Sequence, residues 1–402
     1  MPSFGVSLPR RRFLGTAGGV LATAALGPVL SACGREPAAP AGIVHVANGP
    51  QRVDAVASPD GGTEYPSLRG FTRETGILVD YREVVLDAAG FTAQVRPYLV
   101  RDEPTGWDVI VIRNGPTLGE LLREGLLEEL PLDRRPHFDD HALPTVEDPA
   151  YDPGSRHTMA WRSGMTGIAY DPAATERRVT SLGDLFTREF AGRVGMLGDA
   201  VDMPNLAIVA VGADPASSTP VDWDRAAELL QRQREAGVVV DVGGDPVGAL
   251  RTGRVAVSLA RSSDVYRANE EGASLQFVVP DEGGLLWTDA MCIPRRAADP
   301  VSAMRFMDHV YRPDVAAQIA TSGAYLSPVR GARERLLGLA AKQEDETRAR
   351  ELRAIAASPL AFPTDDDLSR LWTSRDLRDE GEAARWAATF GAYVSAAEPS
   401  SS

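Results

Sequence analysis

Cysteine, basic charge and long apolar runs are all scarce in this 402-residue sequence. Acidic residues outnumber basic ones and leave a net charge of −14 at pH 7. A nucleic-acid partner is therefore disfavoured, because no basic patch is available to neutralise phosphates. Beyond the first 34 residues, no segment is apolar and long enough to span a bilayer. The remaining chain is long enough for two domains of ordinary size.

Motifs for nucleotide, hydrolytic and metal chemistry are also missing. The sequence has no Gly-x-Gly-x-x-Gly or Walker loop and no Gly-x-Ser-x-Gly nucleophile elbow. His137 and His141 have the i,i+4 spacing of metal ligands on a helix, but Pro136 and Pro144 favour a loop there. Further ligands do not converge on this pair in the sequence. We therefore expect no metal and no cofactor, and an enzyme is the least favoured class of function.

The first 34 residues carry two overlapping export signals. Residues 10–14 (RRRFL) fit the twin-arginine pattern, and a Gly/Ala-rich apolar run follows over residues 15–29. Residues 30–34 (LSACG) match a lipobox, in which cleavage before Cys33 leaves that cysteine free for lipidation. We therefore expect an exported protein that is lipid-anchored to the outer face of the cell membrane. An N-terminal transmembrane anchor is the alternative, but the run is short and lacks stop-transfer charges.

The second cysteine, Cys292, is left alone once Cys33 is assigned to the lipobox. No internal disulfide is then possible in the mature chain. Cys292 lies in the apolar, strand-like run over residues 290–294. This setting favours a small buried side chain over a reactive thiol.

Predicted strands and helices alternate along the chain, as in α/β proteins. The predicted strands cover residues 43–47, 77–81, 107–112, 193–197, 238–242, 255–259 and 275–279. The predicted helices cover residues 65–75, 91–99, 118–125, 223–236, 300–311, 313–320 and most of 332–357, with a turn and short helix at 182–186. Because the alternation starts twice, we expect two α/β lobes around a cleft.

Four stretches are specific when they are taken together and in order. Residues 67–81 (SLRGFTRETGILVDY) form a helix, a Thr-Gly-Ile turn and a strand. The other three are residues 161–172 (WRSGMTGIAYDP), 282–294 (EGGLLWTDAMCIP) and 311–316 (YRPDVA). They resemble the opening, the two interlobe crossings and a late helix of extracellular solute-binding proteins of ABC importers, in the spermidine/putrescine (polyamine) branch. The similarity runs over residues 43–396.

The resemblance implies a type II periplasmic-binding-protein fold, in which two α/β lobes close on a ligand by a hinge motion. It also implies a monomer that captures a small amine and delivers it to a membrane permease powered by an ATPase. The expected parts are the twin-arginine lipoprotein signal peptide (1–33), a tether (34–42), lobe 1 (43–163 with 288–326), lobe 2 (164–287 with 327–396) and a disordered tail (397–402).

Polyamine ligands need carboxylates for their ammonium groups and aromatic faces along their methylenes. Trp287 and Asp289 fall on the family's aromatic and carboxylate pair, and alternation along an extended segment places both on one side, facing the cleft. A core aromatic is the alternative for Trp287. The other positions at which the resemblance implies ligand contacts are Asn48, Asn114, Ser163, Asp199, Asp202, Arg261, Asp264 and Tyr325. For the aspartates at 199 and 202, a solvated loop position is the alternative.

Three pocket groups that the family usually has are absent. Residues 47–51 and 113–116, after the first and third predicted strands, lack the usual aromatic or acidic group, and Arg261 stands where Trp is common. A guanidinium group repels an ammonium ligand unless Asp199, Asp202 or Asp264 neutralises it.

These departures leave several interpretations open. A ligand with a carboxylate beside its amine, such as an amino acid or an acylated or oxidised polyamine, would place its amine on Asp289 and its acid on Arg261. An importer component with an unrelated ligand is a second interpretation. A non-transport lipoprotein, a sensor or scaffold with a degenerate pocket, is a third.

Overall fold

The computed structural model describes residues 42–394, except for 59–60, 244 and 323–324. The predicted twin-arginine motif, the lipobox with Cys33 and residues 397–402 of the predicted tail lie outside the described residues. Within the described part of the chain, no helix combines the length and the apolarity needed to cross a membrane.

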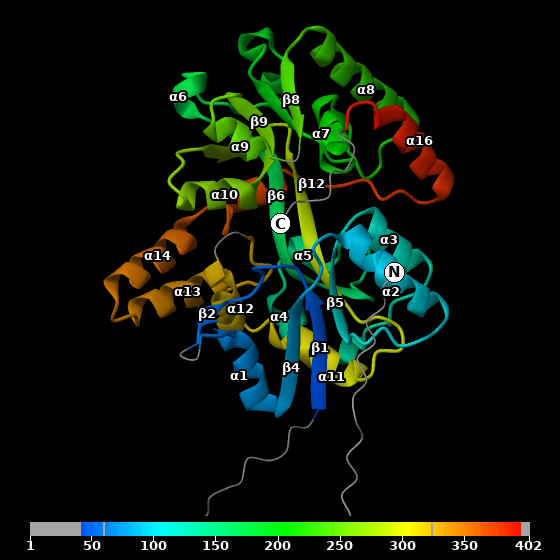
Figure 1. Ribbon diagram of the computed structural model, residues 1–402, viewed down its shortest axis with the longest axis vertical. Coiled ribbons are helices and arrows are strands. Elements are labelled where there is room, and N and C mark those ends of the chain that lie inside the picture. Colours follow the sequence, from blue (N-terminus) through cyan, green and yellow to red (C-terminus); the bar gives the residue numbers. More distant parts are fainter. Residues whose placement is uncertain (1–41, 59–60, 244, 323–324, 395–402) are drawn as a thin grey trace, which may run out of the picture. The chain divides into compact units, whose positions relative to one another are not determined.

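One large mixed sheet joins strands in the order β4-β1-β5-β11-β6-β9-β7-β8 (Figure 1). One parallel set consists of β4 (Ile77–Glu83), β1 (Gly42–Asn48) and β5 (Val109–Arg113). The other parallel set consists of β9 (Val257–Arg261), β7 (Val194–Leu197) and β8 (Val239–Gly243). Strands β11 (Gly284–Cys292) and β6 (Thr158–Tyr170) lie between the two sets and run antiparallel to each other. Two short strands add to the crossing strands: β10 (Gln276–Val278) pairs with β6, and β12 (Leu371–Thr373) pairs with β11. Strands β2 (Val56–Ala57) and β3 (Thr63–Glu64) form a separate two-stranded sheet.

Strands β6 and β11 connect the two halves of the sheet. Residues 289–292 of β11 pair with β5, whereas residues 166–170 of β6 pair with β9. Every residue of both strands is buried. The predicted α/β class with two crossing segments is therefore confirmed, and the candidate ligand residues of these segments lie in the middle of the molecule's sheet.

The helices around the first parallel set begin and end where local signals place them. They are α1 (Pro66–Thr75), α2 (Ala88–Val100), α3 (Pro116–Arg123), η1 (Leu132–Arg134), α4 (Pro136–His141), α5 (Pro144–Glu147) and α11 (Pro300–His309). Helix α1 begins with a proline, whose missing N–H is harmless in the first turn, and ends at Gly76 in the left-handed conformation. The prediction of a loop at residues 136–144 was wrong, because Pro136 and Pro144 likewise open the short helices α4 and α5.

The second half has its own set of helices. They are α6 (Pro172–Thr175), η2 (Leu182–Leu185), η3 (Arg188–Phe190), α7 (Asp202–Ala210), α8 (Pro220–Glu235), α9 (Pro246–Arg251), α10 (Ser262–Glu270), α15 (Asp365–Ser369) and α16 (Glu380–Phe390). Four more, α12 (Pro313–Ile319), η4 (Ala320–Ser322), α13 (Ala332–Ala341) and α14 (Glu346–Ala357), follow α11 along the chain (Figure 1). Several of these helices, among them α7, α9, α10 and α16, were not predicted from the sequence. Helix α7 is buried over nearly its whole length and therefore shows no amphipathic spacing.

Separate hydrophobic clusters hold the two halves of the sheet in place. One cluster contains Phe71, Phe138 and Phe306, which pack beside β1 and β5 residues. Another contains Trp223 and Trp386, whose rings meet edge to face at 5.2 Å, together with residues of β7 and β9. Aromatic pairs of this kind add to the free energy from burial alone. The candidate site lies where the strands that bear these clusters meet.

Candidate ligand-binding site

Strand pairing brings Trp287 and Asp289 to the centre of the sheet. Trp287 lies opposite Gly164 of β6, and Asp289 lies opposite both Arg162 of β6 and Arg113 of β5. Both predicted residues are buried, and only 2% of Asp289 is exposed. The predicted aromatic and carboxylate are thus next to each other, but the neighbours of the carboxylate are guanidinium groups.

Two arginines hold the Asp289 carboxylate. Arg162 donates from Nε to Oδ2 at 2.7 Å, and Nη1 of Arg52 lies 3.0 Å from the same oxygen. Burial by itself raises the pKa of Asp289, but the charges of Arg162 and Arg52 outweigh burial and hold the pKa below its usual range. Burial lowers the pKa of Arg162, the most deeply buried of these arginines, against the opposing effect of Asp289. The carboxylate predicted to hold an amine is therefore ionised and already paired.

A second group of charges lies at the N-terminus of α7. Asp202, the first residue of this helix, accepts from Arg113 Nη2 at 3.1 Å, from Arg261 Nε at 3.1 Å and from Thr166 Oγ1 at 3.0 Å. Arg261 also donates from Nη2 to Asp199 at 3.1 Å. Asp202 is almost wholly buried, so the alternative of a solvated loop position is wrong for this residue.

The surroundings lower the pKa of Asp202 and raise the pKa values of Asp199 and Arg261. Burial raises the pKa of Asp202, but the charges of Arg113 and Arg261 bring it below the usual range. Burial and then the nearby charge of Asp202 raise the pKa of Asp199. Although burial disfavours a charged guanidinium, Asp202 and Asp199 raise the pKa of Arg261. Two of the three predicted aspartates, Asp199 and Asp202, thus neutralise the charge of Arg261. This is the condition predicted from the sequence for a cationic ligand. The third aspartate, Asp264, pairs with Arg267 at 2.6 Å.

The aromatic faces near these charges are also occupied. The Arg113 guanidinium lies 4.6 Å from the ring centre of Trp287, and that of Arg162 lies 3.2 Å from the ring centre of Tyr325. The two rings meet edge to face with their centres 6.0 Å apart. Arginine therefore takes the positions that a ligand ammonium would use over an aromatic ring.

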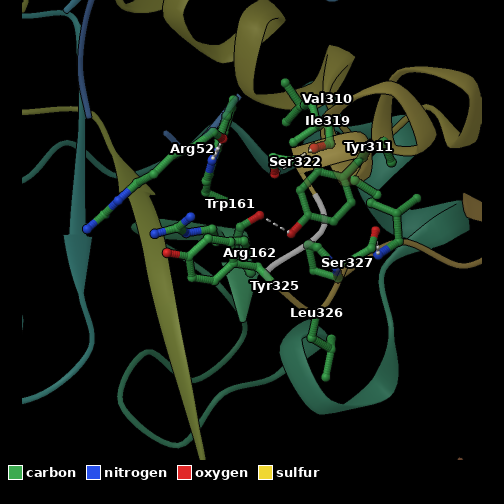
Figure 2. Close-up of a pocket in the computed structure, with 15 residues that line it drawn as sticks. Arg52, Trp161, Arg162, Val310, Tyr311, Ile319, Ser322, Tyr325, Leu326 and Ser327 are labelled. Atoms are coloured by element: carbon green, nitrogen blue, oxygen red, sulfur yellow. Dashed lines mark hydrogen bonds between the residues drawn. The ribbon is translucent and has the colours of Figure 1, made fainter. Parts of the chain in front are cut away.

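A small cavity of about 20 Å³, which is room for about one water molecule, lies beside Arg52 and Arg162 (Figure 2). Its other walls include Trp161, Tyr311 and Tyr325. Trp161 donates from its indole nitrogen to the Arg52 carbonyl at 2.8 Å, and Tyr311 donates to the Ala160 carbonyl at 2.7 Å. These bonds fix the wall from which the Arg52 side chain extends.

Three predicted residues have other surroundings. Asn114 and Ser163 both contact Thr288: the Asn114 Oδ1 accepts from the Thr288 amide at 2.8 Å, and the hydroxyls of Ser163 and Thr288 are 3.0 Å apart. The Thr288 side chain points to the opposite side of β11 from its neighbours Trp287 and Asp289. The fully buried Asn48 accepts from the Gly49 amide at 2.8 Å. Ser163 therefore lies on the opposite side of the strands from Asp289, whereas Asn114 bonds the backbone of β11.

The arginines at 52, 113 and 162 were not predicted as site residues from the sequence. Arg113 stands directly after a predicted strand and Arg162 lies in a crossing segment, so their positions carried a signal. Arg52 comes from a loop without any motif. Nowhere in the described residues are three His, Cys, Asp or Glu side chains grouped in a way that could hold a metal. His137, considered as a metal ligand, instead bonds Asp308 at 2.7 Å.

Comparison with known proteins identifies the family. The family model described as bacterial extracellular solute-binding protein matches residues 70–347, which is more than half of the chain. This chain belongs to that family. The resemblance stated from the sequence motifs is therefore confirmed.

Two curated relatives of this solute-binding protein illustrate its place in the family. It is 29% identical over 259 residues to spermidine/putrescine-binding periplasmic protein 1 of Haemophilus influenzae, covering 64% of this chain and 70% of the relative. It is also 29% identical over 279 residues to the putrescine/agmatine-binding protein of Pseudomonas aeruginosa, covering 64% of this chain and 73% of the relative. These relatives are transport proteins and not enzymes, which is consistent with the prediction that this chain is not an enzyme.

Solved structures show the same fold. The spermidine/putrescine ABC transporter substrate-binding protein of Streptococcus pneumoniae gives a TM-score of 0.70 at 19% identity, over 87% of this chain and 98% of that one. The Tp0655 lipoprotein of Treponema pallidum gives a TM-score of 0.67 at 18% identity, over 88% and 99%. The two-lobed periplasmic-binding-protein fold is thus shared by proteins with little sequence in common.

Proposed function

We propose that this solute-binding protein is the substrate-binding component of an ABC importer and captures a small, polyamine-like amine, either cationic or zwitterionic. The observation that carries the proposal is the convergence of Trp287 and Asp289 with Asp199 and Asp202, which come from both halves of the sheet. Aromatic rings and carboxylates are the groups that recognise organic amines. The relatives' names, which specify spermidine, putrescine and agmatine, support the same class of solute.

The proposed mechanism is closure of two lobes on the solute. We propose that lobe 1 comprises residues 43–163 and 288–326 and that lobe 2 comprises residues 164–287 and 327–396. The Arg113–Asp202 pair, with one member on β5 and the other on α7, is the type of contact that closure would form. A monomeric protein anchored by lipid at Cys33 would then pass the solute to a membrane permease and its ATPase.

A non-transport lipoprotein, acting as a sensor or scaffold, is the second candidate. One observation favours it: each carboxylate proposed for the solute already has an arginine partner within 3.1 Å. A pocket that satisfies its own charges has less to offer a ligand.

Calorimetric titration of the full chain tests the choice between the two candidates. Spermidine, putrescine, and basic and acidic amino acids form the first panel, and dissociation constants in the micromolar range or below support solute capture. No heat from any of these compounds at millimolar concentration would favour the sensor or scaffold.

A further inference from the structure

The charged cluster around Asp289 and Asp202 has more positive than negative groups. Its guanidinium groups belong to Arg52, Arg113, Arg162 and Arg261, and its carboxylates belong to Asp199, Asp202 and Asp289. Four guanidinium groups thus pair with three carboxylates. Counted over these ion pairs, one additional negative charge would balance the four guanidinium groups; the exposed Glu83, whose charge also acts on Tyr81, lies outside the pairs.

Buried hydrogen-bond donors without partners lie at the same place. Among the described residues, Nη1 of Arg162, Nε of Arg52, Nε1 of Trp287 and Nδ2 of Asn48 are buried and bond to no other group. All four atoms are donors, because the Asn48 oxygen is identified by its bond from the Gly49 amide. The Tyr81 hydroxyl, close enough to feel the charges of Glu83, Arg52 and Arg162, is also without a partner. Buried donors normally have acceptors, so these four atoms are available to a bound acceptor.

Arg52 and Arg162 are placed to share one acceptor group. Both bond the same oxygen of Asp289, so their guanidinium groups are neighbours. Both line the small cavity, and their guanidinium groups extend to the same side, away from Tyr311, Ser322 and Ser327 (Figure 2). Only 5% of Arg162 is exposed, whereas the Arg52 side chain is 18% exposed and lies nearer to solvent.

A purely cationic solute finds no free partner in this cluster. Asp289 and Asp202 are ionised and each is shared by two arginines, and arginines cover the rings of Trp287 and Tyr325. An ammonium group would enter a region of net positive charge and would have to displace a guanidinium. Asp199, with 30% of its side chain exposed, is the carboxylate most accessible to an amine.

We propose that the solute of this protein carries a carboxylate, and that Arg52 and Arg162 bind it. The carboxylate oxygens would accept from Nη1 of Arg162 and Nε of Arg52, and its single charge would balance the cluster. The solute is then an amino acid, or a polyamine derivative with an acid group, and not an unmodified polyamine. This inference rests on the proposed function, since it names the chemical class of the solute that the cleft captures.

Matched ligands test the proposal on the full chain by calorimetry at pH 7. 4-Aminobutanoate and putrescine share a four-carbon chain and one amine, and differ in having a carboxylate or an ammonium at the other end. L-Glutamate, L-arginine, spermidine and inorganic phosphate complete the series. We expect at least one amino acid of the series to bind, and 4-aminobutanoate to bind at least tenfold more tightly than putrescine.

The possible outcomes separate this inference from the proposed function. Binding of putrescine or spermidine in preference to every carboxylate would overturn the inference and leave the function as a solute-binding protein intact. Preference for phosphate over all carboxylates would also overturn it, because the site would then be a general anion site. Failure of every compound to bind would overturn the proposed function, and the inference with it.

Two variants locate the carboxylate. Arg52→Gln removes one guanidinium, and Gly49→Ala displaces it without removing charge, because a Cβ atom at residue 49 would collide with the Arg52 side chain. Each should weaken binding of the best carboxylate at least tenfold. Arg82→Gln, which removes an exposed arginine of β4 that pairs with Asp80, is the matched control and should leave affinity unchanged. Unchanged affinity in both test variants, with thermal unfolding as in the wild type, would show that Arg52 does not bind the solute.

Discussion

The indole ring of Trp287 packs directly against Gly164, the residue that faces it across β11 and β6. A Cβ atom on Gly164 would collide with the six-membered part of that ring. The lack of a side chain at Gly164 therefore leaves the space that the Trp287 ring occupies, with Arg113 over the ring.

Replacement of this glycine should destabilise the protein. We expect Gly164→Ala to lower the free energy of unfolding by about 1–3 kcal/mol, because Trp287 or the strand must move. Gly70→Ala is the control, since Gly70 lies within α1 and a Cβ atom there meets no neighbour within 4 Å. That change should stabilise the protein by up to about 1 kcal/mol. Urea unfolding measures both, and equal stabilities of Gly164→Ala and the wild type would contradict the contact.

Loss of the Asp289 charge should cost stability as well as affinity. Asp289→Asn leaves Arg162 and Arg52 facing each other without a counter-charge, and we expect a loss of about 3–5 kcal/mol in the free energy of unfolding. The double variant Asp289→Asn/Arg162→Gln removes one of the unpaired cations. In urea unfolding, the double variant should lose less free energy of unfolding than Asp289→Asn and Arg162→Gln lose in total as single variants, by about 1 kcal/mol or more. Strict additivity would mean that the two side chains are not coupled.

His309 should make the protein less stable in mild acid. Burial, and then the charge of Arg312, lowers the pKa of this histidine to about 4, well under its usual value of about 6.5. The unfolded chain therefore takes up a proton between these pH values that the native state does not, and stability falls as the pH decreases from about 6.5 to about 4. At pH 5 the loss from this group should be about 2 kcal/mol.

The variant His309→Phe isolates this effect. It keeps an aromatic ring beside Phe71, whose ring centre lies 5.2 Å from that of His309, and removes the titrating group. Its loss of stability between pH 7 and pH 5 should be smaller than that of the wild type by about 2 kcal/mol. If both proteins lose the same amount in urea unfolding, His309 is not responsible.

Cys292 should be inert in the native protein. It is fully buried in β11, and burial raises the pKa of its thiol. In a Cys33→Ser variant, we expect a thiol reagent to modify Cys292 only after unfolding, because the reactive thiolate is neither formed nor accessible in the fold. The measurement is the rate of modification with and without urea. Rapid reaction in native buffer would contradict the buried environment, which agrees with the sequence prediction of a small buried side chain.

The predictable parts of the fold are those whose signals are local. The strand at 43–47 and the helix at 65–75 were identified because apolar spacing, an N-terminal proline and a closing glycine act within a few residues. Strand β6 was recognised as a crossing segment only by resemblance. It is buried on both faces while it contains Gly, Ser, Thr and Arg, so neither alternation nor an apolar run marks it.

The sequence by itself determined the family and the α/β class, and it singled out Trp287, Asp289 and Arg261 as candidate site residues. Only the tertiary structure decided which charges meet. Arg162 reaches Asp289 across 127 positions of sequence, and Arg113 reaches Asp202 across 89. The charge of a buried group depends on neighbours within a few ångströms, and here those neighbours come from distant strands and helices. A carboxylate that the motif assigned to an amine ligand is for this reason bound to the protein's own arginines.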